Sequence, residues 1–246
     1  MSRTRTNVPA HSRKRLLLAL AAGALVAAAL VATSLVNARA ESPKPVAETA
    51  SEAAAGTAEV SRLLSGIPQD GTFVGRPDAP VTLVEYADLQ CPYCAQWARE
   101  TLPALIRDYV RPGKLRIEFR GLAFIGPDSD SALRTALAAA AHDRLWHVVE
   151  LLYLNQGAEN SGWASDELLG GILEASGLDP AAVLGARGSQ EVEGLLLRAN
   201  TQAQAARVQG TPSFQLGRTG EALPPLTPHT LAPPPFRAAV EQLLGS

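Results

Sequence analysis

The apolar and polar residues of this chain follow three successive patterns. Residues 16–36 form an unbroken apolar run without a charge or a proline. Residues 41–58 mix Ala, Glu, Pro, Ser and Thr with almost no large apolar side chains, so they cannot bury enough surface to fold. Beyond them, helical and strand-like patterns alternate. The chain is therefore predicted to contain a flexible linker over 37–58 and one folded domain over 59–246.

Periodicity within that domain predicts an α/β fold. The run 81–87 is β-branched and aromatic and follows Pro80, which is typical of a buried strand. A strand–helix–strand start favours a parallel pair joined by a right-handed crossover, with helices covering the sheet. Further strands are expected at 115–119 and 213–216, and helices near 59–64, at 98–109 with a kink or division at Pro103, at 133–152 with a break near His142, and at 166–175, 179–208 and 236–244.

The apolar run near the N-terminus is preceded by a basic segment, residues 1–15, which ends in Arg13-Lys14-Arg15. At about 1.5 Å per residue the run 16–36 spans roughly 30 Å, the thickness of a bilayer's hydrocarbon core. The positive-inside rule keeps the basic flank cytoplasmic and places the domain outside. Ala38-Arg39-Ala40 matches a signal-peptidase site, which would release the protein after Ala40. The length of the run favours an uncleaved transmembrane anchor over a signal peptide, and both interpretations stay open.

Composition and charge exclude several classes of protein. Apolar residues make up 46% of the 246 residues and charged residues 19%, which is too apolar for wholesale disorder. The net charge of −2 is unevenly distributed, because residues 1–44 hold seven of the 22 basic residues and one of the 24 acidic ones. The remaining chain therefore carries a net charge of about −8, which argues against nucleic-acid binding.

The candidate chemistry lies in the only two cysteines, Cys91 and Cys94. Two cysteines exclude a disulfide-stapled miniprotein and a four-cysteine zinc site. The pair follows a predicted strand at the start of a predicted helix, where Pro92 suits the first helical position. Unpaired N–H groups at a helix N-terminus favour a thiolate at Cys91, which is the form that attacks or leaves in thiol–disulfide exchange. Cys94, one turn further along, would resolve the mixed disulfide.

Two alternatives to a redox pair carry less weight. An inert structural disulfide between Cys91 and Cys94 would close a loop too short to constrain much of the unfolded chain. A zinc site would need His142 and His147, whose spacing of five places them about 140° apart on a straight helix. We therefore expect no metal, and we expect the two histidines to be ordinary surface or packed residues.

The segment from Ala79 to Cys94, Ala-Pro-Val-Thr-Leu-Val-Glu-Tyr-Ala-Asp-Leu-Gln-Cys-Pro-Tyr-Cys, resembles the active-site region of exported DsbA-type thiol–disulfide oxidoreductases. Two further features carry the resemblance: a long helical insertion at about 127–200 and Gly210-Thr211-Pro212 before a late strand, which matches the family's cis-proline loop. The resemblance runs from about Ile67 to Leu244. It implies a thioredoxin-like fold with an inserted helical subdomain.

The resemblance also implies a role for each cysteine and for a nearby acid. Cys91 would be the exposed nucleophile and Cys94 the buried resolving thiol, so that their disulfide serves in place of an external cofactor. Glu85 matches the family's buried glutamate beneath the active site, and burial would raise the pKa of that carboxyl so that it exchanges a proton with Cys94. A solvent-facing strand position is the alternative for Glu85.

Four further positions correspond to substrate-contacting residues of the family. Pro92 and Tyr93 would tune the redox potential and touch the substrate. Pro212 would be cis and pack against the disulfide, and Thr211 would offer backbone groups to an extended substrate segment. Tyr93 is a departure, because the best-known oxidant of the family has a histidine there. Without an imidazolium beside the thiolate, this protein is expected to be a weaker oxidant.

The functional expectation is an enzyme that inserts disulfides into exported client proteins with free thiols. A membrane redox partner would re-oxidise it, no nucleic acid would bind, and the enzyme would act as a monomer. Two alternatives stay open: a disulfide isomerase or reductase, and a redox-inactive binding or chaperone module on the same fold. Residues 41–66 are too short for the dimerisation domain that isomerases usually carry.

Overall fold

The computed structural model describes residues 56–245. The predicted basic segment 1–15, the apolar run 16–36 and the linker up to residue 55 lie outside the described residues. Residues 56–64 form a helix, so the last three positions of the predicted linker are helical. Within 56–245, no helix combines the length and apolar character that crossing a membrane requires.

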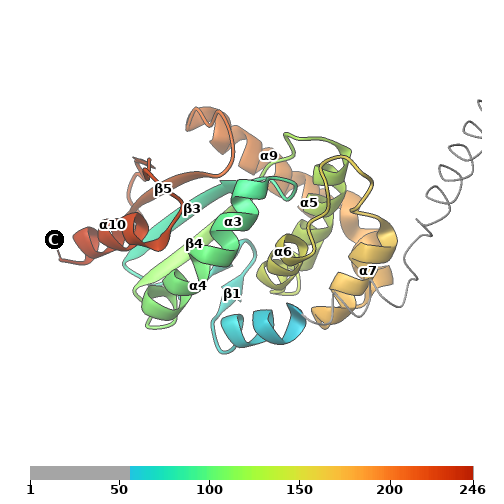
Figure 1. Cartoon of the computed structure of the whole chain (residues 1–246), viewed down its shortest axis with the longest axis horizontal. Coiled ribbons are helices and arrows are strands. Elements are labelled where there is room, and N and C mark those ends of the chain that lie inside the picture. The colour runs from blue at the N-terminus through green and yellow to red at the C-terminus, as the bar shows by residue number, and fades with distance from the viewer. Residues whose placement is uncertain (1–55, 246) are drawn as a thin grey trace, which may run out of the picture. The chain divides into compact units, whose positions relative to one another are not determined.

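A sheet of six strands forms the centre of the described chain (Figure 1). Its order is β1-β2-β4-β3-β5-β6, in which β3 and β4 are parallel and β5 is antiparallel to β3. This arrangement confirms the predicted parallel pair. The strands are β1 Gln69–Asp70, β2 Phe73–Val74, β3 Val81–Ala87, β4 Leu115–Gly121, β5 Ser213–Arg218 and β6 Pro225–Leu226.

Helices cover the sheet, and α3 lies across the strands while α5, α6 and α7 group beside it (Figure 1). The crossover between β3 and β4 is α3, α4 and a π-helical turn, and the insertion between β4 and β5 begins with α5 and ends with α9. The helical elements are α3 Pro92–Glu100, α4 Leu102–Leu105, the π-helical turn Ile106–Val110, α5 Pro127–Ala140, α6 Leu145–Leu154, α7 Asp166–Ala175, α8 Pro180–Gly185, a 3₁₀ turn Ala186–Gly188, α9 Gln190–Ala205 and α10 Pro233–Gly245.

Both predicted helix breaks are present, and one further break was not predicted. Pro103 stands in the first turn of α4, where the helix expected over 98–109 is divided into α3 and α4. Asp143 has a φ of 54° and separates α5 from α6. The single helix expected over 179–208 was wrong, because Ser189 leaves the helical path and caps a new helix by accepting a hydrogen bond from the amide of Val192.

The two faces of β3 carry different neighbours, and this places the functional side chains. Leu83 and Ala87 belong to the large core together with Trp97 of α3 and residues of α6. Tyr86 points to the opposite face, where its hydroxyl donates to the carbonyl of Gln202 in α9. Strand alternation therefore directs position 85 toward α3 and α6. The carboxyl end of β3 leads directly into the cysteine pair.

Candidate active site

The cysteine motif occupies the N-terminus of α3. Cys91 is the N-cap, with an extended backbone, and Pro92 takes the first helical position. No side chain caps this helix end, and its first turn contains no acidic residue. The unpaired amides of the first turn therefore face the Cys91 sulfur, as the sequence predicted.

Hydrogen bonds make Cys91 unusually acidic. The main cause is a hydrogen bond from Cys94, which together with the Thr211 side chain and the amides of Cys94 and Tyr93 lowers the pKa of Cys91 to about 6 against the opposing effect of burial. When protonated, the Cys91 thiol donates to the carbonyl oxygen of Thr211 at 3.2 Å. Both cysteines are free thiols in this structure.

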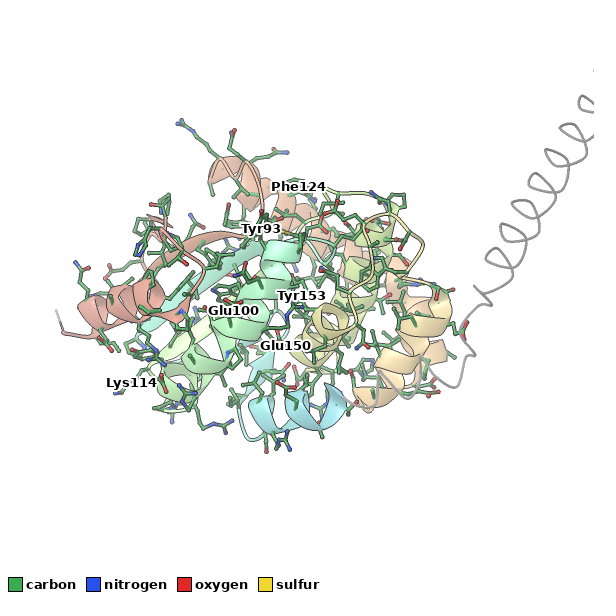
Figure 2. The ribbon with its side chains drawn as sticks, viewed as in Figure 1. Tyr93, Glu100, Lys114, Phe124, Glu150 and Tyr153 are labelled. Atoms are coloured by element: carbon green, nitrogen blue, oxygen red, sulfur yellow. The ribbon has the colours of Figure 1, made fainter. Side chains whose placement is uncertain are left out.

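The exposure of the motif differs from the expectation in one respect. Cys91 was expected to be exposed, but only 4% of it is accessible, since it sits in the corner between the helix end and the backbone of Thr211. Pro92 is exposed, and Tyr93 is 62% exposed. Tyr93 and Phe124, another exposed aromatic residue, lie at the same end of the domain (Figure 2). The exposed surface next to the Cys91 thiol is therefore formed by neighbouring residues such as Pro92 and Tyr93.

Cys94 and Glu85 lie beneath this surface, in agreement with the prediction. Cys94 is fully buried, and burial is the main reason that its pKa lies well above the ordinary value. The hydrogen bond with Cys91 and the charge of Glu85 raise it further. Glu85 is 1% exposed, and burial raises its pKa well above the usual range, with added contributions from Glu150 and Cys91. The solvent-facing alternative for Glu85 is therefore wrong.

The loop before β5 completes the rim of the site. The Thr211–Pro212 peptide bond is cis, as the resemblance implied. The loop borders a cavity of about 670 Å³ that is lined mainly by residues 206–215 and 225–228. The structure thus brings Thr211 against Cys91 and places an open groove alongside.

Asp88 organises the loop that leads into the motif and was not identified from the sequence. Its Oδ2 accepts hydrogen bonds from the amides of Phe124 and Ile125 at 2.7 and 3.0 Å. Its Oδ1 accepts from the Ser129 hydroxyl at 2.6 Å and from the Gln90 amide at 2.8 Å. This buried carboxylate ties the end of β3 to the start of α5. A polar residue directly after a buried strand is the signal that could have indicated it.

Helix α6 and the residues just after it supply three further groups that sequence reasoning missed. Gln156, just after the helix, donates to the carbonyl of Cys91 at 3.2 Å. Glu150 and Tyr153 are buried, and burial raises the pKa of Glu150 to about 8 and that of Tyr153 well above its usual range. A single acid inside the apolar run Leu-Trp-His-Val-Val-Glu-Leu-Leu-Tyr-Leu is the signal that could have found Glu150.

The histidines considered as metal ligands are not brought together with other ligands. His142 is exposed, and His147 forms a hydrogen bond of 3.0 Å between its Nδ1 and the side-chain amide of Gln69. Residues 56–245 contain no group of three or more His, Cys, Asp or Glu side chains arranged to hold a metal ion.

Comparisons with known proteins agree with this arrangement. The family model described as Thioredoxin matches residues 68–223. The probable disulfide bond formation protein D of Bacillus anthracis is 32% identical over 144 residues, which are 57% of this chain and 66% of that protein, just under two thirds of its length.

Solved structures share the fold. BdbD from Bacillus subtilis superposes with a TM-score of 0.63 at 20% identity, covering 73% of this chain and 98% of that one. Alpha-DsbA1 from Wolbachia pipientis gives 0.60 at 18% identity, covering 76% and 96%. These structures confirm a thioredoxin-like fold with a helical insertion. The family match over residues 68–223 shows that the chain belongs to the thioredoxin family.

Proposed function

We propose that this protein is an exported thiol–disulfide oxidoreductase that forms disulfide bonds in secreted or cell-envelope proteins. One observation carries the proposal: the two thiols of one motif differ strongly in acidity. Cys91 has a pKa of about 6, whereas burial holds the pKa of Cys94 well above its ordinary value. At pH 7 the pKa of about 6 leaves roughly ten Cys91 thiolates for each thiol.

The exchange reaction uses this difference. A client thiolate attacks the Cys91 sulfur of the oxidised pair, the Cys91–Cys94 bond breaks, and its electron pair leaves on Cys94. Glu85 gives that sulfur a proton, because the buried thiol is much more stable than a buried thiolate. A second client thiolate then attacks the client sulfur of the mixed disulfide and releases the Cys91 thiolate. The client gains a disulfide, and the enzyme keeps both electrons.

Direction of electron flow follows from the stability of the leaving group. A thiolate that is stable at neutral pH favours the reduced enzyme and therefore the oxidation of its client. Tyr93 supplies no positive charge beside Cys91, so we place the reduction potential below that of the strongest oxidants of this type. A disulfide isomerase or reductase and a redox-inactive chaperone are the alternatives that the measurements below separate.

Client binding is assigned to the rim of the site. Thr211 would pair its backbone with an extended client segment, and Pro212 would pack beside the reacting sulfurs. The cavity along residues 206–215 offers room for client side chains. Exposed Pro92 and Tyr93 would contact the client from the helix side.

The decisive measurement is the reduction potential of the Cys91–Cys94 pair, combined with a dithiothreitol-oxidation assay. We expect a potential well above about −270 mV, the value typical of a thioredoxin-like reductant, and a value near −270 mV would defeat the oxidase assignment. Cys91→Ser should abolish turnover. Equal rates for that variant and the wild type would leave only the binding module.

Export and partners complete the proposal. Residues 16–36 would anchor the domain outside the cytoplasmic membrane, with secretion after cleavage at Ala40 as the alternative. A membrane redox partner would re-oxidise the pair, and the enzyme would act as a monomer. Trapping with Cys94→Ser tests this, because a variant without the resolving thiol retains both clients and partner as mixed disulfides on Cys91. Captured proteins confined to the cytoplasm would contradict the assignment.

A further inference from the structure

The proposed reaction requires one proton to cross into and out of a buried site. In the reduced enzyme Cys94 carries a proton and Glu85 also holds one, because burial raises both pKa values well above their usual range. In the disulfide form Cys94 has no proton. Each oxidation of the pair therefore releases one proton from beneath the active site, and each reduction takes one up. Cys91 does not carry this proton, since it is mostly a thiolate at pH 7.

The outer face of the site offers that proton a poor exit. Cys94 is fully buried, and Cys91 above it is only 4% exposed. During the second step of exchange, a mixed-disulfide partner also stands over Cys91. The proton that Glu85 accepts from Cys94 must therefore leave through the face of the sheet that α3 and α6 cover.

A second buried carboxyl group, that of Glu150, lies on this face of the sheet. Glu150 on α6 is 6% exposed, and its Oε1 has no hydrogen-bond partner in the described structure, as is also true of Oε1 of Glu85. Such groups are costly to bury, so two together call for an explanation. Helix α6 packs on α3, where Arg99 donates to the carbonyl of Tyr153 at 3.2 Å, and Figure 2 shows Glu150 and Tyr153 between the two helices.

Four titratable groups join the cysteine to the far side of α6. The charge of Glu150 acts on Glu85, and Tyr153, one turn along α6, interacts with Cys94, Glu85 and Glu150. On its other side Glu150 interacts with Glu59, which is exposed on the helix over residues 56–64. Electrostatic interactions between these groups thus connect the resolving thiol with a solvent-facing carboxylate.

The acidity of Glu150 suits proton transfer in both directions. Burial, with a contribution from Glu59, raises the pKa of Glu150 to about 8, near neutral pH. Glu150 can therefore take a proton from water or release one at physiological pH. The two basic residues at the start of α6 have other surroundings, since His147 is bonded to Gln69 and Arg144, the N-cap, is exposed.

We propose that Glu150 is the proton-relay residue of this enzyme, passing protons between Glu85 and the solvent beside Glu59. On oxidation, Glu150 first releases its proton to water, and Glu85 then passes its own proton to the Glu150 carboxylate. Cys94 gives its proton to the Glu85 carboxylate as its sulfur attacks Cys91. On reduction each transfer runs in reverse. This inference rests on the proposed function and adds a route for its proton.

The test separates the two chemical steps of oxidation. Reduced full-length protein is mixed with glutathione disulfide, quenched with acid at intervals and analysed by mass spectrometry. Formation of the glutathione adduct on Cys91 needs no buried proton transfer, whereas its loss through attack by Cys94 does. We expect Glu150→Gln to leave the first step unchanged and to slow the second about tenfold, less than the full effect of a positioned acid–base group. Glu150→Asp should restore most of the rate.

A double variant distinguishes a relay from a structural role. Glu85→Gln should slow the second step more than Glu150→Gln does, and adding Glu150→Gln to it should cause no further loss, since both act on one path. Glu100→Gln, which removes an exposed carboxyl at the end of α3, is the matched control and should behave as the wild type. Independent losses in the double variant, an unchanged second step in Glu150→Gln, or equal slowing of both steps would overturn the relay. Absence of the glutathione adduct on the wild type would instead refute the proposed function.

Discussion

The acidity of Cys91 depends first on the side chain of Cys94, and replacing that side chain measures the dependence. Cys94→Ala removes the hydrogen bond that contributes most to lowering the pKa of Cys91 to about 6. It leaves in place the amides at the start of α3 and the contact with Thr211. Cys94→Ser is the matched control, because its hydroxyl group keeps a donor at the same position.

The size of the effect follows from the strength of such a bond. A hydrogen bond to a charged group contributes about 1.5–3 kcal/mol, and one pKa unit corresponds to about 1.4 kcal/mol. Cys94→Ala should therefore raise the pKa of Cys91 by about one to two units. The small cavity left by the sulfur admits no compensating donor, so we expect little recovery. Cys94→Ser should shift the pKa by less than half as much.

The pKa is measured from the rate of alkylation by iodoacetamide between pH 4.5 and 9, followed by mass spectrometry. In the wild type only Cys91 reacts in this range, because Cys94 is fully buried and its pKa is raised. The midpoint for the wild type should lie near pH 6. A midpoint in Cys94→Ala within about 0.3 units of the wild type would show that the helix end alone sets the acidity, and would refute the reasoning.

Four further predictions concern stability and client contact. The lowered pKa of Cys91 gives a stabilisation that is full above the unfolded value of 9.0 and is lost as pH falls through about 6. The advantage of the reduced wild type over Cys91→Ser in urea unfolding should therefore grow by about 1.4 kcal/mol per pH unit between pH 6 and 9. Glu150 has the opposite sign: its raised pKa costs the folded state stability as pH rises from 4.5 to about 8, so Glu150→Gln should unfold at higher urea than the wild type at pH 8, and equal midpoints would contradict this. Asp88→Asn replaces one of two carboxylate oxygens, each of which accepts two hydrogen bonds, with an NH2 donor, and should cost about 3 kcal/mol, measured as a lower thermal midpoint. Tyr93→Ala should change stability by less than about 0.5 kcal/mol and weaken only client oxidation.

The elements that the sequence predicted are those with enough length to show a period. The strands at 81–87, 115–121 and 213–218 and the helix at 166–175 extend over six residues or more, so alternation or helical spacing is visible. The strands β1, β2 and β6 have two residues each and exist only because a neighbouring strand pairs with them. The break at Ser189 also escaped prediction, although Gly185 and Gly188 precede it and Ser189 itself is a good N-cap residue.

The active-site residues also differ in whether they have a local sequence signature. Cys91, Cys94 and the loop at Thr211 have a local signature, because motif spacing and the proline are read along the chain. Asp88 and Gln156 act through hydrogen bonds to segments more than 30 residues away, and no pattern within the sequence records such contacts. The sequence could mark the position of Asp88 after a strand, but the bonding partners of both residues needed coordinates.

Glu150 is identified by the sequence pattern and the structure together. An acid in the middle of an apolar helix contradicts the hydrophobic pattern that buries the helix, and such a conflict lowers stability unless the charge is paired. Its Oε1 has no hydrogen-bond partner among residues 56–245. A leucine there would pack at lower cost, so stability does not explain the acid. Because conflicts between local pattern and fold concentrate at functional sites, the sequence marks the position and the structure supplies the reason, which is the interaction of Glu150 with the buried Glu85.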